Sequence, residues 1–124
     1  MITPMHGLHL TADLRDCAPA APTMNDPEHL RALCRRAVAD AGLQPVGELF
    51  HRFPAPGGVT GMVLLAESHV AVHTWPELAA VTLDVYVCNL QADNNARAAA
   101  LLAALEALFA PGRVERHRIE RGRP

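Results

Sequence analysis

The chain has 124 residues, half of them hydrophobic, and its 11 basic and 13 acidic residues give a formal net charge of −2 at pH 7. This length suits one domain, residues 1–124, and the scattered basic residues argue against a nucleic-acid surface. Three cysteines, a start from Met1 to His6 without secretion-signal features, and the lack of an apolar run near the ~20 residues of a membrane span predict a cytoplasmic protein.

The first half of the chain predicts three strands and one helix. Residues 7–14 alternate loosely in polarity, which is typical of a strand, and prolines at 19 and 22 predict a loop after it. Asp26 is a suitable N-cap before Pro27, and apolar residues at three- and four-residue steps predict a helix to about residue 41. Strands are expected over 46–53 and 59–66, joined by a Pro- and Gly-rich turn.

The second half predicts three more strands and a second helix. Strands are expected over 69–74, 80–87 and 114–119, and an Ala- and Leu-rich helix over 96–109 that Pro111-Gly112 ends. This order predicts an α+β fold, a two-layer sandwich with a mainly antiparallel sheet and both helices on one face. The other sheet face is then free to bind a partner.

A group of reactive residues surrounds the central strand. Glu67-Ser68 precedes it, His73 lies near its end, Glu77 follows in a His-Thr-Trp-Pro-Glu run, and Cys88 comes twenty residues after the serine. All eleven basic residues are arginine, so a lysine Schiff base to pyridoxal phosphate is impossible. If the chain handles amino-acid carbons through an imine, a pyruvoyl group made from the chain would supply the carbonyl.

This stretch resembles the self-cleavage site of the small bacterial S-adenosylmethionine decarboxylases. The resemblance covers most of the chain and is most specific from His51 to Cys88. It implies that the Ser68 hydroxyl attacks the Glu67 carbonyl and that the resulting ester eliminates and hydrolyses to a pyruvoyl group. The products would be a β chain, residues 1–67, and an α chain, residues 68–124.

The resemblance also implies a role for each site residue. The pyruvoyl group from Ser68 would form a Schiff base with S-adenosylmethionine, and Cys88 would donate the proton after decarboxylation. His73 would be the processing base, supported by Thr60. Phe53 would stack on adenine, and Glu77 would accept hydrogen bonds from the ribose hydroxyls. The product would supply spermidine synthesis, and the enzyme would be a homodimer with active sites built from both subunits.

The chain departs from the family pattern in four places. Thr60 stands where many members have serine, and one extra residue lies between Phe53 and Thr60. The usual Thr-Cys-Gly around the acid cysteine is Val87-Cys88-Asn89, and the segment from Asp13 to Cys17 lacks the family's aromatic residues.

Several alternatives stay open at this point. The same scaffold could decarboxylate arginine or ornithine, which would need a carboxylate near the distal end of the substrate. An unprocessed homologue could be a binding or regulatory subunit, and His69, His73 and Cys88 could be zinc ligands. Trp75 is expected to serve in packing, and Phe53 suits either the core or a substrate platform.

Overall fold

The computed structural model describes residues 6–18, 23–90 and 92–122. The elements in chain order are β1 (Gly7–Arg15), α1 (Pro27–Asp40), β2 (Pro45–Arg52), β3 (Val59–Leu65), β4 (Ser68–Trp75), a 3-10 helix (Pro76–Leu78), β5 (Ala80–Cys88), α2 (Asn95–Ala107) and β6 (Arg113–Arg121). The predicted strands and helices are confirmed, with ends that differ by one or two residues. The loop prolines at 19 and 22 lie outside the described residues, and the 3-10 helix was not predicted.

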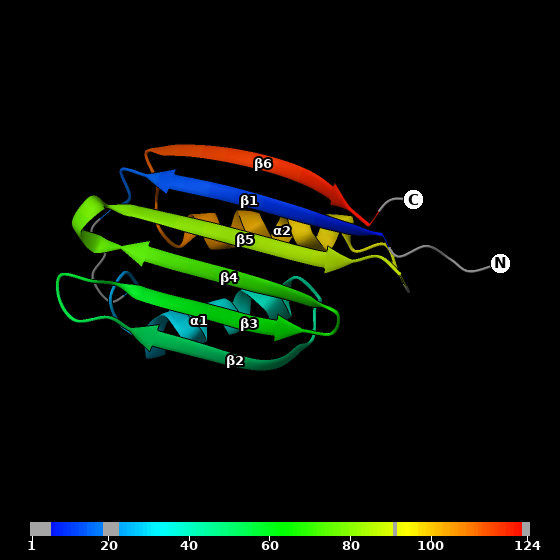
Figure 1. The fold of residues 1–124 in the computed structure, drawn as a ribbon, viewed down its shortest axis with the longest axis horizontal. Coiled ribbons are helices and arrows are strands. Elements are labelled where there is room, and N and C mark those ends of the chain that lie inside the picture. Colours follow the sequence, from blue (N-terminus) through cyan, green and yellow to red (C-terminus); the bar gives the residue numbers. More distant parts are fainter. Residues whose placement is uncertain (1–5, 19–22, 91, 123–124) are drawn as a thin grey trace.

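The strands form one sheet in the order β2-β3-β4-β5-β1-β6, and the neighbouring strands pair antiparallel. Both helices lie on the same side of the sheet, behind it in the view of Figure 1. α1 packs against β2 and β3, and α2 packs against β5 and β1. The predicted α+β two-layer fold is therefore confirmed.

The first helix begins and ends as its sequence predicts. Asp26 caps it by accepting hydrogen bonds from the backbone N–H groups of Glu28 and His29, at 3.0 and 3.4 Å. Gly42 follows with a φ of 80°, which glycine adopts without the steric cost that other residues meet. Within the described residues, neither helix is long and apolar enough to cross a membrane.

The core lies between the sheet and the helices. Its largest fully buried side chains come from every layer: Phe109, Leu8, Leu14, Leu30, Leu83, Leu101 and Leu105, with a set of valines from α1 and the central strands. Cys17 and Cys34 are buried in the same cluster, as predicted for small apolar groups. Burial raises the pKa of the Cys34 thiol to about 12, which keeps it protonated at neutral pH.

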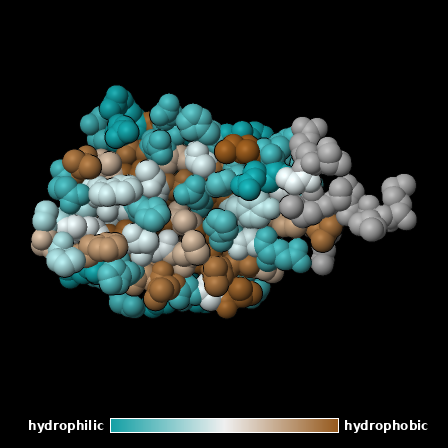
Figure 2. Space-filling model, in the orientation of Figure 1, coloured by the Kyte–Doolittle hydropathy of each residue, from teal (hydrophilic) through white to brown (hydrophobic). Residues whose placement is uncertain are grey.

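The opposite sheet face carries exposed apolar side chains toward the β2 edge. Leu49, Met62 and Leu64 are 76%, 41% and 48% exposed. They line a hollow of about 380 Å³ together with His51, Thr60, Ala71 and His73. Figure 2 shows hydrophobic residues gathered along this side of the face. A contiguous apolar surface of this kind is typical of an interface.

Candidate active site

The turn between β3 and β4 places an unusual backbone conformation next to Ser68. Leu65 pairs with Ser68 in the ladder, so Ala66 and Glu67 form a two-residue connection. Glu67 has a φ of 56°, in the left-handed region that non-glycine residues seldom occupy. Such a conformation costs ~1–3 kcal/mol and is held only by its surroundings. The peptide bond that precedes Ser68 is thus part of a strained turn.

Ser68 and Cys88 meet at this end of the sheet. The Cys88 backbone N–H donates to the Ser68 Oγ with an N–O distance of 3.1 Å, and both residues are partly buried. A hollow of about 250 Å³ opens beside them and is lined by Ala66, Glu67, Cys88, Ala92 and Asn94. The sequence indicated Glu67, Ser68 and Cys88, but it did not indicate Asn94.

A second group lies where β3 begins and β4 ends. Thr60 Oγ1 lies 3.1 Å from His73 Nδ1, so one of these atoms donates a hydrogen bond to the other. The His73 ring stacks on Trp75, with centroids 5.9 Å apart and an interplanar angle of 27°. A hollow of about 330 Å³ is lined by these three residues and by Phe53, Gly57, Gly58, Thr74 and Glu77.

The aromatic residues of this second group are on the surface. Phe53 is 45% exposed and Trp75 is 38% exposed, and both line the hollow. Of the two uses expected for Phe53, its exposure argues against a place in the core. Trp75 packs against His73, as expected, and it also lines the hollow.

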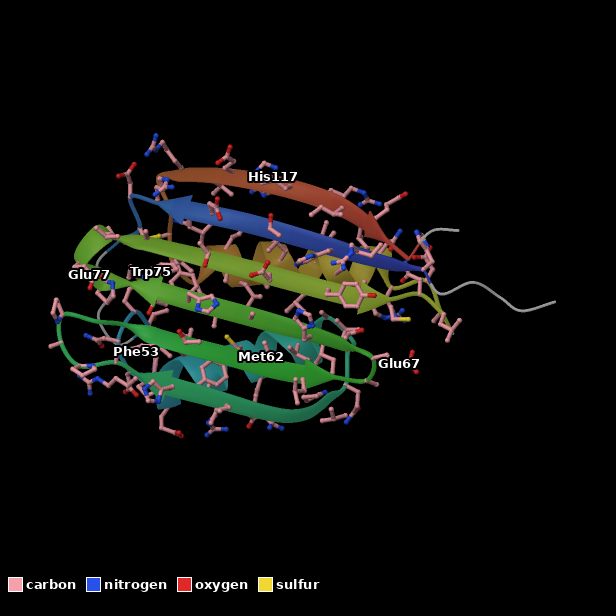
Figure 3. The ribbon with its side chains drawn as sticks, viewed as in Figure 1. Phe53, Met62, Glu67, Trp75, Glu77 and His117 are labelled. Carbon is pink, nitrogen blue, oxygen red and sulfur yellow. The ribbon has the colours of Figure 1, made fainter. Side chains whose placement is uncertain are left out.

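The two groups lie at opposite ends of the sheet. Ser68 begins β4 and His73 comes five residues later, which is about 16 Å along an extended strand. Figure 3 shows Glu67 at one end and Phe53, Trp75 and Glu77 at the other. One protomer therefore brings Ser68 to Cys88 and Thr60 to His73, but it does not bring His73 to Ser68.

A histidine cluster lies between the two groups, and the sequence indicated its member His69 only as a possible zinc ligand. His9 Nε2 is 3.1 Å from Asp84 Oδ1, and the His69 ring stacks on Tyr86 with centroids 5.7 Å apart. Burial lowers the pKa of His69, and the neighbouring His9 lowers it further. These residues lie on predicted strands, and strand alternation places their side chains on one face of the sheet. The sequence pattern could therefore have indicated the cluster.

The same geometry disfavours the zinc alternative. His69 and His73 are four residues apart on one strand, which separates them by about 13 Å. Ligand nitrogens of one zinc ion lie only about 2.0–2.1 Å from the metal. The two histidines of one protomer therefore cannot share an ion.

Comparisons with known proteins all point to one family. Residues 8–122 match the family model described as S-adenosylmethionine decarboxylase. Similar curated proteins are the S-adenosylmethionine decarboxylase proenzymes of Symbiobacterium thermophilum, 39% identical over 100 residues, and of Aquifex aeolicus, 44% identical over 82 residues. These alignments cover 81% and 66% of this chain, and 74% and 58% of the two relatives.

A solved structure agrees over nearly the whole chain. The crystal structure of the adenosylmethionine decarboxylase from Aquifex aeolicus superposes with a TM-score of 0.85 and 32% sequence identity. The match covers 98% of this chain and 95% of that one.

Proposed function

The chain belongs to the S-adenosylmethionine decarboxylase family, and from this premise we propose that it is a self-processing carboxy-lyase whose pyruvoyl group is made from Ser68. It decarboxylates S-adenosylmethionine and so supplies the aminopropyl donor for spermidine synthesis. The observation that carries the proposal is the turn in which Glu67 has a positive φ and the Ser68 hydroxyl oxygen is held by the Cys88 N–H.

Self-cleavage begins with the Ser68 hydroxyl. Its Oγ attacks the Glu67 carbonyl carbon, a C–O bond replaces the C–N bond, and the freed amine of residue 68 gains a proton. A base then removes the α-proton of residue 68, and the Cβ–O bond breaks, so that the serine oxygen leaves as part of the Glu67 carboxylate. Water replaces the amine, which leaves as ammonia. The products are a β chain of residues 1–67 and an α chain of residues 68–124.

The residues around position 68 fit a pyruvoyl group. The position is partly buried at a strand end, next to Cys88 and a hollow with room for a substrate amine. When present, this group supplies an electrophilic carbonyl that binds the substrate amine and accepts electron density as carbon dioxide leaves. Cys88 then holds the proton that is delivered to the substrate carbon.

The Phe53 hollow supplies the recognition of the adenosyl group. The partly exposed Phe53 ring offers a face for adenine, and the aromatic surface favours the sulfonium cation. The Glu77 carboxylate has two acceptor oxygens, which suit the vicinal hydroxyls of ribose. An arginine or ornithine side chain could also contact the ring and the carboxylate as a cation, but it has neither adenine nor vicinal hydroxyls, so the pair favours S-adenosylmethionine.

A homodimer completes the site. His73 is too far from Ser68 of its own chain to act on it, whereas a second copy packed face to face in the opposite direction brings the two ends together. The exposed Leu49, Met62 and Leu64 provide apolar surface for this contact. Thr60, His73, Phe53 and Glu77 of one copy then serve Ser68 and Cys88 of the other.

The test is the mass of the denatured protein, with and without S-adenosylmethionine and borohydride. Two fragments that meet between Glu67 and Ser68, with substrate mass added to the α fragment after reduction, would support both cofactor and substrate. Fragments that gain mass only with arginine or ornithine would overturn the substrate. An intact chain after long incubation would overturn self-processing and favour a binding protein.

A further inference from the structure

Asn94 lies at the N-cap of α2, but its side chain does not cap the helix. Asparagine is favoured there because its oxygen accepts a hydrogen bond from the first helical turn. In the described chain the Asn94 side chain makes no such bond. Its Oδ1 accepts from Arg97 Nη1 at 3.1 Å, and its Nδ2 donates to the Cys88 carbonyl oxygen at 2.9 Å. The side chain thus connects the start of α2 to Cys88.

Both main-chain polar groups of Cys88 are held by side chains. The N–H donates to Ser68 Oγ at 3.1 Å, and the carbonyl accepts from Asn94 at 2.9 Å. These two groups flank the Cys88 Cα, so holding both restricts its φ and ψ and fixes the direction of the Cα–Cβ bond. β5 ends at this residue, which pairs with Gly7 of β1, and the N–H of the next residue, Asn89, donates to the His6 carbonyl at 2.7 Å. The Ser68 and Asn94 side chains thus add to these backbone contacts in holding the Cα–Cβ bond that carries the thiol.

The loop that carries Asn94 is closed by a network of asparagines. Asn89 Oδ1 accepts from the Asn94 N–H at 2.8 Å, and Asn89 Nδ2 donates to Asn95 Oδ1 at 2.7 Å. Asn94 also lines the hollow beside Glu67 and Cys88. These side-chain hydrogen bonds support the loop after the cysteine.

We propose that Asn94 is a positioning residue that holds the Cys88 thiol in place beside residue 68. The inference rests on the proposed self-cleavage, because that step moves the serine oxygen onto Glu67 and so removes one of the two side-chain contacts of Cys88. The Asn94 contact then remains. Asn94 accordingly matters little for cleavage and much for the thiol of the processed enzyme.

The experiment compares three variants. Asn94→Ala removes the donor to Cys88, and Asn94→Ser caps helices well but is too short to reach the Cys88 carbonyl. Asn95→Asp is the matched control, since it keeps the oxygen that accepts from Asn89. Each protein is assayed for self-cleavage, for the rate of Cys88 alkylation by iodoacetamide, located by fragment mass, and for kcat and KM. The buried Cys17 and Cys34 serve as slow internal references.

Both Asn94 variants are expected to cleave close to the wild-type rate and to unfold near the wild-type temperature. Their Cys88 thiol should be alkylated about fivefold faster, the effect expected when one hydrogen bond that limits local opening is lost. Their kcat should fall with KM little changed, and Asn95→Asp should match the wild type.

Three outcomes would overturn the inference. The first is an Asn94→Ala protein with unchanged alkylation and kcat. The second is wild-type behaviour in Asn94→Ser, which would assign Asn94 to helix capping. The third is an Asn95→Asp protein whose alkylation rate and kcat change as much as those of the Asn94 variants. A wild-type chain that stays intact would count against the proposed function instead. The alkylation rates still decide on Asn94 in that case, because its contact with Cys88 exists in the uncleaved chain.

Discussion

The Ser68 hydroxyl oxygen and the Cys88 backbone N–H form a 3.1 Å hydrogen bond across the end of the sheet. Because the contact uses only the main chain of Cys88, it survives a change of the cysteine side chain. Orientation of the nucleophile before cleavage is therefore separable from the chemistry of the thiol after cleavage.

The first prediction uses this separation. Ser68→Ala removes the nucleophile, so the chain should stay intact. Cys88→Ala keeps the N–H that holds Ser68, so it should cleave normally but turn over substrate 10²–10⁴-fold more slowly, the usual contribution of a general acid. Gel analysis measures cleavage, and carbon dioxide release measures turnover. A fully active Cys88→Ala enzyme would refute the assignment of Cys88 as proton donor.

The second prediction concerns the site shared between two chains. Ser68→Ala and His73→Ala chains, expressed separately, should both stay intact. When they are co-expressed, a mixed dimer joins the intact Ser68 of one chain to the intact His73 of the other, and the His73→Ala chain alone should be cleaved. Differently tagged chains make this visible on a gel. Co-expression of two His73→Ala chains is the control, and absence of cleavage in proven mixed dimers would contradict the composite site.

The fold followed from the sequence because local signals agreed with one another. Alternation predicted the strands, and Asp26-Pro27 and Gly42 predicted where the first helix begins and ends. The site was only partly predictable. The contact of Ser68 with Cys88 depends on how β4 and β5 align at their ends, which strand patterns leave undetermined. The separation of Ser68 from His73 was implied by a strand between them, since five extended residues span about 16 Å.

The Asn94 contact shows a different limit of sequence analysis. Asp93-Asn94-Asn95 predicts a helix start correctly, yet the Asn94 side chain bonds to the Cys88 carbonyl and the Arg97 side chain and not to the backbone of the first helical turn. An asparagine at an N-cap position can bond either to the helix backbone or to another segment of the chain. The position of the preceding loop decides which of these hydrogen bonds forms.

The third prediction concerns the pH dependence of stability. Hydrogen bonds from Arg35, at 2.7 and 2.8 Å, with a weaker one from Arg31, lower the pKa of Glu48. The unfolded chain, with an ordinary value of about 4.3, then takes up the proton first as pH falls. The stabilisation is thus complete above that value and is lost as pH falls through the folded pKa.

Glu48→Gln should therefore lower the unfolding temperature at pH 7 and have a much smaller effect at an acidic pH below the folded pKa of Glu48, where the wild-type carboxyl is also neutral. Thermal unfolding followed by circular dichroism at both pH values measures this. Glu28→Gln is the control, because Glu28 is 77% exposed and its pair with Arg31 contributes little. An equal loss at both pH values would mean that shape, not charge, makes Glu48 important.

The last prediction concerns Thr74, which lines the Phe53 hollow and hydrogen-bonds to two backbone groups in the interior. Its side chain is buried; Oγ1 donates to the Met24 carbonyl at 2.7 Å and accepts from the Val59 N–H at 2.8 Å. Thr74→Val keeps the volume but leaves both groups unpaired in the interior, so unfolding should cost ~1–3 kcal/mol less in urea titrations. Thr74→Ser keeps both bonds and should lose less. If valine were tolerated as well as serine, packing rather than hydrogen bonding would hold this segment.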